Sequence, residues 1–205
     1  MIYEYMMKSH NSTKDDENAR YKSWEHCHKY FLENRIKSNN KEILCLHLAF
    51  YLASWGMLRG GAFLLQRDYL VHLPVIEIIL DEKYGQLWDC AEEYLDKDAT
   101  LDLIDDCKKR IIEVYLEKTK IVNDKTTQGY TASDTLVTKI MLGTFGCVPA
   151  YDRYFRLGVK TLGVSNQKFS RKSIQQLANY YRSNKDFDNV SKEIKKNGIF
   201  IRQPN

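Results

Sequence analysis

Few residues that end helices interrupt this chain: prolines occur only at Pro74, Pro149 and Pro204, and there are ten glycines in 205 residues. Between them, apolar residues recur at every third or fourth position nearly throughout. That spacing is typical of α-helices that bury one face, and no segment is predicted as a strand. The sequence therefore predicts an all-α fold, a compact multi-helix domain.

The interruptions in the apolar pattern also predict where the helices begin and end. The predicted helices cover about 17–36, 41–58, 62–72, 74–82, 83–96, 100–119, 133–142, 173–183 and 188–197, with a further helix opened by Pro149. Pro74 suits the first turn of its helix. Residues 41–58 are apolar on nearly all sides, so we expect this helix to be the most buried element.

The length of the chain, 205 residues and 24.1 kDa, is enough for one hydrophobic core to fold alone. We expect one domain over 1–205; the pattern leaves open whether it is built as two packed lobes, about 1–120 and 121–205, with a cleft between them. No run of 18 apolar residues and no apolar signal core occurs. We therefore expect a soluble, cytoplasmic monomer without a membrane partner.

The cysteines and histidines do not form a recognisable ligand set. The five cysteines are odd in number and widely spaced, which is unlike a disulfide framework, so we expect them to be reduced. His26 and His28 lie two positions apart on a predicted helix and point about 200° away from each other. No metal site is expected there, and His28 is better explained as a core residue.

Charge is distributed unevenly along the chain. Residues 77–117 carry 13 Asp and Glu against 5 Lys and Arg, a local balance of −8, whereas residues 151–205 carry 12 Lys and Arg against 4 acids, a balance of +8. The basic region could meet the phosphates of a nucleic acid, or it could be a solvated face. The charges alone leave both interpretations open.

One segment carries a specific resemblance. Residues 136–155, LVTKIMLGTFGCVPAYDRYF, predict a helix, a glycine break, a short link with one proline, and an aspartate at the start of another helix. This arrangement resembles the catalytic core of helix-hairpin-helix DNA glycosylases. Thr144-Phe145-Gly146 matches the small-aromatic-glycine step that ends the family's helix, and residues 148–155 match its proline-containing link and aspartate turn.

The resemblance implies that Asp152 is the catalytic residue. Cleavage of an N-glycosidic bond builds positive charge on the sugar, and a nearby carboxylate can stabilise that charge and orient the attacking water. The alternative is that Asp152 only caps the helix that follows it, because acids are favoured at that position.

Other family positions are changed in this chain. The hairpin of the family usually reads Leu-Pro-Gly-Val-Gly, whereas residues 129–135 read GYTASDT and keep only Gly129. The lyase lysine of bifunctional members falls near Thr135, which cannot form a Schiff base, so the resemblance implies a monofunctional enzyme. The closely spaced cysteines of iron–sulfur relatives do not occur, and no cofactor is expected.

A glycosylase must take its target base out of the duplex and hold it in a pocket. The candidates for pocket walls are Tyr51, Trp55 and Tyr151, and the candidates for reading the base are Arg59, Gln66 and Arg67. The candidates for contact with DNA phosphates are Lys139, Arg153, Arg156 and Lys160. The alternatives are ordinary packing for the aromatic residues and an ordinary solvated position for the polar residues, Lys139 included.

Three functions follow from these patterns. The first is a monofunctional DNA glycosylase that removes a modified or damaged base, with DNA as its partner. Its overall pattern is similar to antiphage glycosylases that act on hypermodified cytosine in viral DNA. The second is a helical nucleic-acid-binding domain without enzymatic activity. The third is a helical protein-interaction module whose acidic 77–117 region binds a basic partner.

Overall fold

The computed structural model describes residues 16, 18–19, 22–36, 40–88, 90, 94–122, 125–126 and 129–184. The α-helices of these residues are α2 (Ser23–Asn34), α3 (Lys41–Ser54), α4 (Leu73–Ile79), α5 (Asp98–Thr119), α6 (Asp134–Gly143), α7 (Arg153–Thr161) and α8 (Arg171–Ser183). Short 3-10 helices occupy η2 (Phe63–Gln66), η3 (Tyr69–His72) and η4 (Glu82–Leu87). The described strands are β1 (Ile121–Val122) and β2 (Lys125–Thr126), one antiparallel pair. The predicted all-α fold is confirmed.

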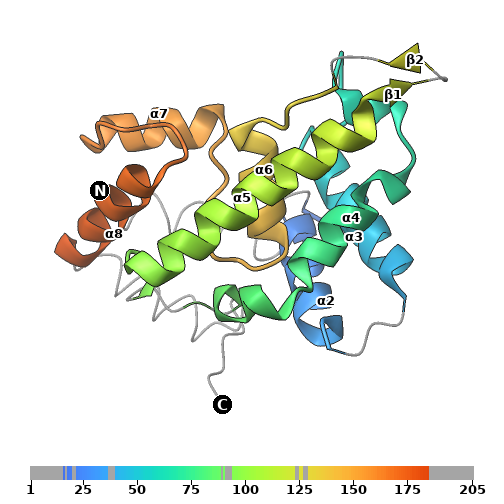
Figure 1. Cartoon of the computed structure of the whole chain (residues 1–205). Helices are drawn as coiled ribbons and strands as arrows, with labels where there is room; N and C mark the ends of the chain where they lie inside the picture. The colour runs from blue at the N-terminus through green and yellow to red at the C-terminus, as the bar shows by residue number, and fades with distance from the viewer. Residues whose placement is uncertain are drawn as a thin grey trace.

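The long helix α5 runs along the molecule, with α2, α3 and α4 towards one end and α7 and α8 towards the other (Figure 1). Helix α6 packs against α2, α3 and α5, and α4 packs against α3 and α5. The guanidinium of Arg171, at the start of α8, pairs with three aspartates of α5: Asp98, Asp102 and Asp105. Helix α8 is therefore joined to α5 by charge.

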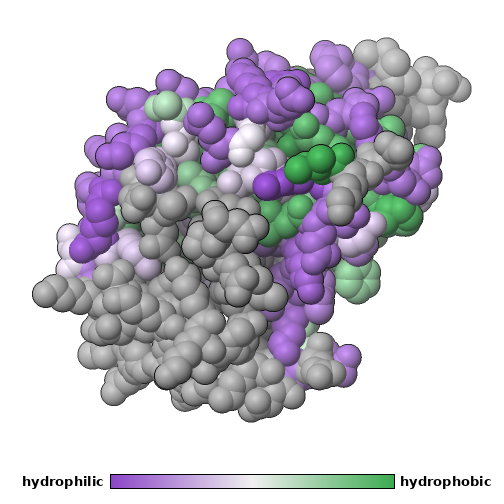
Figure 2. Space-filling model, turned by 90° about the horizontal axis from the view of Figure 1, so that it is seen from below, coloured by the Kyte–Doolittle hydropathy of each residue, from purple (hydrophilic) through white to green (hydrophobic). Residues whose placement is uncertain are grey.

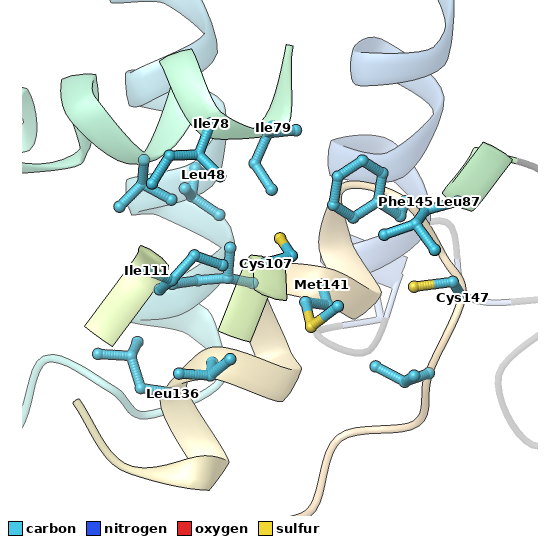
Figure 3. Packing of buried hydrophobic residues seen from close by; sticks show 14 of the residues in the cluster. Leu48, Ile78, Ile79, Leu87, Cys107, Ile111, Leu136, Met141, Phe145 and Cys147 are labelled. Atoms are coloured by element: carbon cyan, nitrogen blue, oxygen red, sulfur yellow. The ribbon is translucent and has the colours of Figure 1, made fainter. Parts of the chain in front are cut away.

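Buried apolar side chains from most of these elements form one continuous cluster. Figure 3 shows its centre, where Leu48 of α3, Ile78 and Ile79 of α4, Cys107 of α5 and Met141 of α6 converge. Residues before and after position 120 share this core. The division into two lobes with a cleft stays a prediction.

The prediction that 41–58 is the most buried helix is wrong. In α6 seven of ten residues are buried, whereas in α3 five of fourteen are. Phe50 of α3 is 71% exposed and Leu46 is 43% exposed. Helix α6 contacts α2, α3 and α5, while one face of α3 meets solvent although its residues are apolar. Figure 2 shows that hydrophobic residues also gather on part of the molecular face seen from below.

Several predicted boundaries also change. Helix α3 ends at Ser54 because Gly56 takes a positive φ of 74° and the Met57 N–H donates to the Leu52 carbonyl, which closes the helix end. The predicted helices at 62–72 and 83–96 are replaced by 3-10 turns where described. Extended residues interrupt them, Arg67 and Asp68 in the first segment and Trp88 in the second. The predicted helix at 188–197 lies outside the described residues.

The remaining expectations concern disulfides, membrane-spanning helices and metal sites. Cys27, Cys45, Cys90, Cys107 and Cys147 are all buried free thiols. Within the described ranges, no helix combines the length and apolarity needed to cross a membrane. In the same part of the chain, no three His, Cys, Asp or Glu side chains gather as metal ligands would.

Gly143, in the last turn of α6, lies directly against the ring of Tyr51 on α3. A Cβ placed there would lie 2.7 Å from Cδ1 of Tyr51 and closer still to Cε1, inside the core. Gly143→Ala should therefore lower the free energy of unfolding by about 1–3 kcal/mol through overpacking. Gly158→Ala on α7 is the matched control: its Cβ would meet open space, so a gain of about 0.5–1 kcal/mol is expected. Urea denaturation of both variants checks this, and equal stabilities would contradict the packing.

A buried histidine makes stability depend on pH. His72 is 2% exposed, its Nδ1 lies 2.7 Å from the Tyr115 hydroxyl, and burial lowers its pKa from 6.5 to about 4. Between these values the unfolded chain binds a proton that the folded chain excludes. The contribution of neutral His72 to the free energy of unfolding should therefore be fully present above pH 6.5. It should fall by about 3 kcal/mol as the pH drops to 4.

Urea denaturation at several pH values tests this contribution. His72→Gln should remove much of the slope between pH 6.5 and 4, and the lowered pKa of His47, also caused by burial, leaves a smaller slope of the same sign. His26→Gln, at an exposed position of α2, is the control and should keep the slope. If the free energy of unfolding of His72→Gln depends on pH as that of the wild type does, other groups cause the pH dependence.

Candidate functional site

Asp152 lies where the sequence predicts it, at the start of a helix. It is the N-cap of α7, and its Oδ1 accepts a hydrogen bond from the Phe155 N–H at 3.0 Å. The expectation that Pro149 opens this helix is wrong, because Pro149 lies in the link and helical geometry begins at Arg153. The Asp152 side chain keeps 23% of its surface exposed. Capping leaves Oδ2 available for another role.

The residue before Asp152 fixes the position of the turn. Tyr151 is fully buried; its N–H donates to the Thr138 hydroxyl at 2.8 Å, and its carbonyl accepts from the Thr135 hydroxyl at 3.0 Å. Its own hydroxyl lies 2.8 Å from that of Ser173 on α8. These bonds tie the turn to α6 and α8. The structure thus gives Tyr151 a packing role in place of the predicted pocket wall.

Lys139 of α6 reaches the same corner from the interior. Its side chain is only 6% exposed, and its Nζ lies 3.9 Å from Oδ2 of Asp152 and donates to the carbonyl oxygen of Trp55 at 2.8 Å. Neither predicted role, contact with phosphate or a solvated helix position, fits this burial. The ammonium instead connects the end of α3 to the carboxylate of Asp152.

Two of the predicted pocket residues, Tyr51 and Trp55, lie beside this pair. Nζ of Lys139 lies 5.5 Å from the centre of the Trp55 ring, and the Trp55 and Tyr51 rings are 5.7 Å apart. The Trp55 indole N–H donates to Ser23 at 3.0 Å, so its ring is held in place. Burial raises the pKa of the Tyr51 hydroxyl, and the nearby Cys27 thiol and Asp152 carboxylate raise it further. Tyr51, Trp55, Lys139 and Asp152 therefore form one cluster.

The Tyr51 hydroxyl is a buried polar group without a hydrogen-bond partner among the described residues. An unsatisfied hydroxyl is costly inside a protein. Its ring is confined against Gly143, so the hydroxyl cannot turn freely towards a new partner. Because Tyr51 is fully buried, we expect a buried water molecule to satisfy it.

The polar candidates on the 58–68 segment are more distant from this chemistry. Arg59 and Gln66 are exposed, and Arg67 is half-buried. Arg59 lies over Gly56, directly after Trp55. Within the described ranges, no hydrogen bond or ion pair connects Arg59, Gln66 or Arg67 to Asp152. Their role in reading a base stays a prediction.

The cations predicted to contact phosphates follow Asp152 on α7. Arg153, Arg156 and Lys160 are all exposed, and they make no ion pair with other residues of the described chain. Arg171 and Arg182 of α8, by contrast, are engaged by the carboxylates of Asp102 and Asp96. Three exposed cations without an ion pair among the described residues therefore lie together on α7.

The segment before α6, residues 129–133, packs on α5. Gly129 has a φ of 74°, and a Cβ there would lie 2.7 Å from the Leu116 carbonyl oxygen. The Tyr130 N–H donates to the Thr119 hydroxyl at 2.6 Å, and the Tyr130 ring stacks on Phe63. Ser133 then caps α6 by accepting from the Leu136 N–H. This segment positions α6 without repeated glycines.

The acidic region is largely used within the chain. The guanidinium of Arg110 pairs with Asp81, Lys83 pairs with Asp106, and Lys41 pairs with Glu77. The α8 arginines take up further aspartates of this region. Fewer of these carboxylates are left for a basic protein partner than the local balance of −8 indicates.

Sequence reasoning missed the position of Lys139, because its apolar neighbours on α6 conceal which face turns inward. A signal was present: Lys139 is the one basic residue among the ten of α6, and five of the other nine are apolar. The arrangement as a whole can hold a carboxylate in a defined orientation beside an ammonium, two aromatic rings and a cationic helix.

Comparison with models of protein families, with curated proteins and with solved structures finds no match to this chain.

Proposed function

We propose that this chain is a monofunctional DNA glycosylase that removes a modified or damaged base. The single observation that carries the proposal is the Asp152 carboxylate, which uses one oxygen to cap α7 and holds the other 3.9 Å from the Lys139 ammonium at a partly exposed corner. A carboxylate held in this way can stabilise the positive charge that develops on the sugar and orient the attacking water.

The surroundings of Asp152 support a nucleic-acid substrate. Arg153, Arg156 and Lys160 follow it on the exposed side of α7, where they could neutralise backbone phosphates. Trp55, which is half-buried, supplies aromatic surface beside the carboxylate, which suits an extruded base. Tyr51 is fully buried beneath it, so the prediction that Tyr51 forms a wall of the pocket is wrong. We further propose that the substrate is phage DNA with hypermodified cytosine, which would make the enzyme an antiphage defence protein of the cytoplasm.

Lys139 fits a monofunctional mechanism. A lyase lysine attacks the sugar as a neutral amine. Nζ of Lys139 instead donates to the Trp55 carbonyl and faces a carboxylate, which are the contacts of an ammonium. We therefore assign Lys139 to positioning, and expect hydrolysis by water without strand cleavage.

An abasic-site assay tests the proposal. DNA from phages with and without hypermodified cytosine is incubated with the full chain, and new abasic sites are labelled through their aldehydes. We expect abasic sites in the modified DNA, strand breaks only after alkali, and no covalent adduct after borohydride. Absence of abasic sites in every DNA, with binding retained, would leave the alternative of a non-enzymatic nucleic-acid-binding domain, which the cations of α7 favour.

A further inference from the structure

The exposed face of α7 combines two kinds of side chain. Tyr154 is 82% exposed and Leu157 is 61% exposed, although both are large and apolar in character. Residues 153–184, from α7 to the end of α8, contain seven Lys and Arg and no Asp or Glu. Helix α7 lies at the edge of the fold in Figure 1, where a large partner could reach it.

The two kinds of side chain are separated on the helix surface. With about 100° between successive residues, Arg156, Lys160 and Arg153 occupy one side of the exposed arc, and Leu157 and Tyr154 occupy the other. Phe155 and Val159 face the protein on the opposite side of the helix. A row of cations thus runs beside a row of apolar side chains.

This pattern fits an opened nucleic-acid duplex better than an intact one. Phosphates attract the cations, but the outside of a paired duplex offers little apolar surface to an aromatic and a leucine side chain. Bases become available for apolar contact when the duplex is unstacked, and proteins that open a duplex insert such side chains between base steps. Tyr154 also lies in the first turn of α7, directly after the Asp152 cap.

We propose that Tyr154 and Leu157 contact the unstacked bases beside the extruded nucleotide, while Arg153, Arg156 and Lys160 hold the flanking phosphates. The inference rests on the proposed function for its substrate, since base extrusion is what opens the stack. It is tested by equilibrium binding alone, so that its failure can be distinguished from absence of glycosylase activity.

The experiment compares a fully paired short duplex with the same duplex that carries one tetrahydrofuran abasic-site analogue, which leaves a gap in the stack. The wild type should bind the gapped duplex more tightly. Tyr154→Ala with Leu157→Ala should reduce that preference about tenfold and leave the salt dependence of binding unchanged. Arg153→Glu with Arg156→Glu should flatten the slope of log affinity against log salt for both DNAs.

Phe50→Ala is the matched control, because Phe50 is 71% exposed on α3, away from α7, and should not alter the preference. The inference is overturned if the Tyr154/Leu157 variant keeps the wild-type preference, or if it loses affinity for both duplexes equally, which would indicate contact with the backbone. It is also overturned if the wild type binds neither duplex, since the face would then serve a protein partner.

Discussion

Replacement of Lys139 by Met is expected to slow base release by about 100-fold while the chain remains folded, because a reacting group displaced by about 1 Å can lose that much rate. Lys139 holds the Trp55 carbonyl at 2.8 Å and stands 3.9 Å from the Asp152 carboxylate. Methionine fills a similar volume but holds neither group. In this variant Oδ1 of Asp152 would still accept the hydrogen bond from the Phe155 N–H. Oδ2 would lose the neighbouring ammonium that holds it in position.

The measurement is the single-turnover rate on a DNA that the wild type cleaves, together with the affinity for that DNA. A positioning role predicts a loss of rate with little loss of affinity, since the buried ammonium does not reach phosphates. Lys118→Met removes the same charge from an exposed position of α5 and is the control. A wild-type rate in Lys139→Met, or an equal loss in both variants, would contradict this role.

The helical class of the fold could be predicted from the sequence because apolar spacing reports local geometry. How deeply each helix is buried could not be predicted in the same way. Residues 41–58 are apolar on nearly all sides, yet Phe50 meets solvent, while seven of the ten residues of α6 are buried, Lys139 among them. Burial depends on which elements surround a helix, and periodicity contains no information about that.

In the candidate site, too, contacts between neighbouring residues could be predicted, whereas contacts between residues far apart in the sequence could not. The cap at Asp152 is a local property of residues 152–155 and could be predicted. The contact between Lys139 and Trp55 joins residues 84 positions apart, so no spacing rule predicts it. Tyr151 could be placed next to Asp152, but its bonds to Thr138 and Ser173, which make it a core residue, depend on how α6 and α8 pack.

The exposed side chains of α7 could be predicted in part from the sequence. Phe155 and Val159 mark the buried side of the helix, so Tyr154 and Leu157 fall on the outward side by geometry alone. Their significance depends on which cations remain unpaired, and that is a tertiary property: Arg171 and Arg182 are neutralised by distant aspartates, whereas Arg153 and Arg156 are not.

The second large effect is expected from Asp152→Asn. Asparagine keeps the size of the side chain and caps a helix about as well as aspartate, so the chain should stay folded although the buried ammonium of Lys139 loses the charge of its carboxylate neighbour. It removes the negative charge that faces the developing sugar cation. The rate of base release should therefore fall at least about 100-fold, while DNA affinity stays within a few-fold of the wild type.

The most direct test of the central claim is the rate of abasic-site formation by Asp152→Asn in modified phage DNA, measured beside the wild type. Asp68→Asn makes the same chemical change at another helix cap, where Asp68 accepts from the Leu70 N–H at 2.8 Å, and should keep full activity. We predict abasic sites with the wild type and with Asp68→Asn, and a loss of at least about 100-fold with Asp152→Asn. Base release by a folded Asp152→Asn variant at the wild-type rate would contradict the assignment of Asp152 as the catalytic residue.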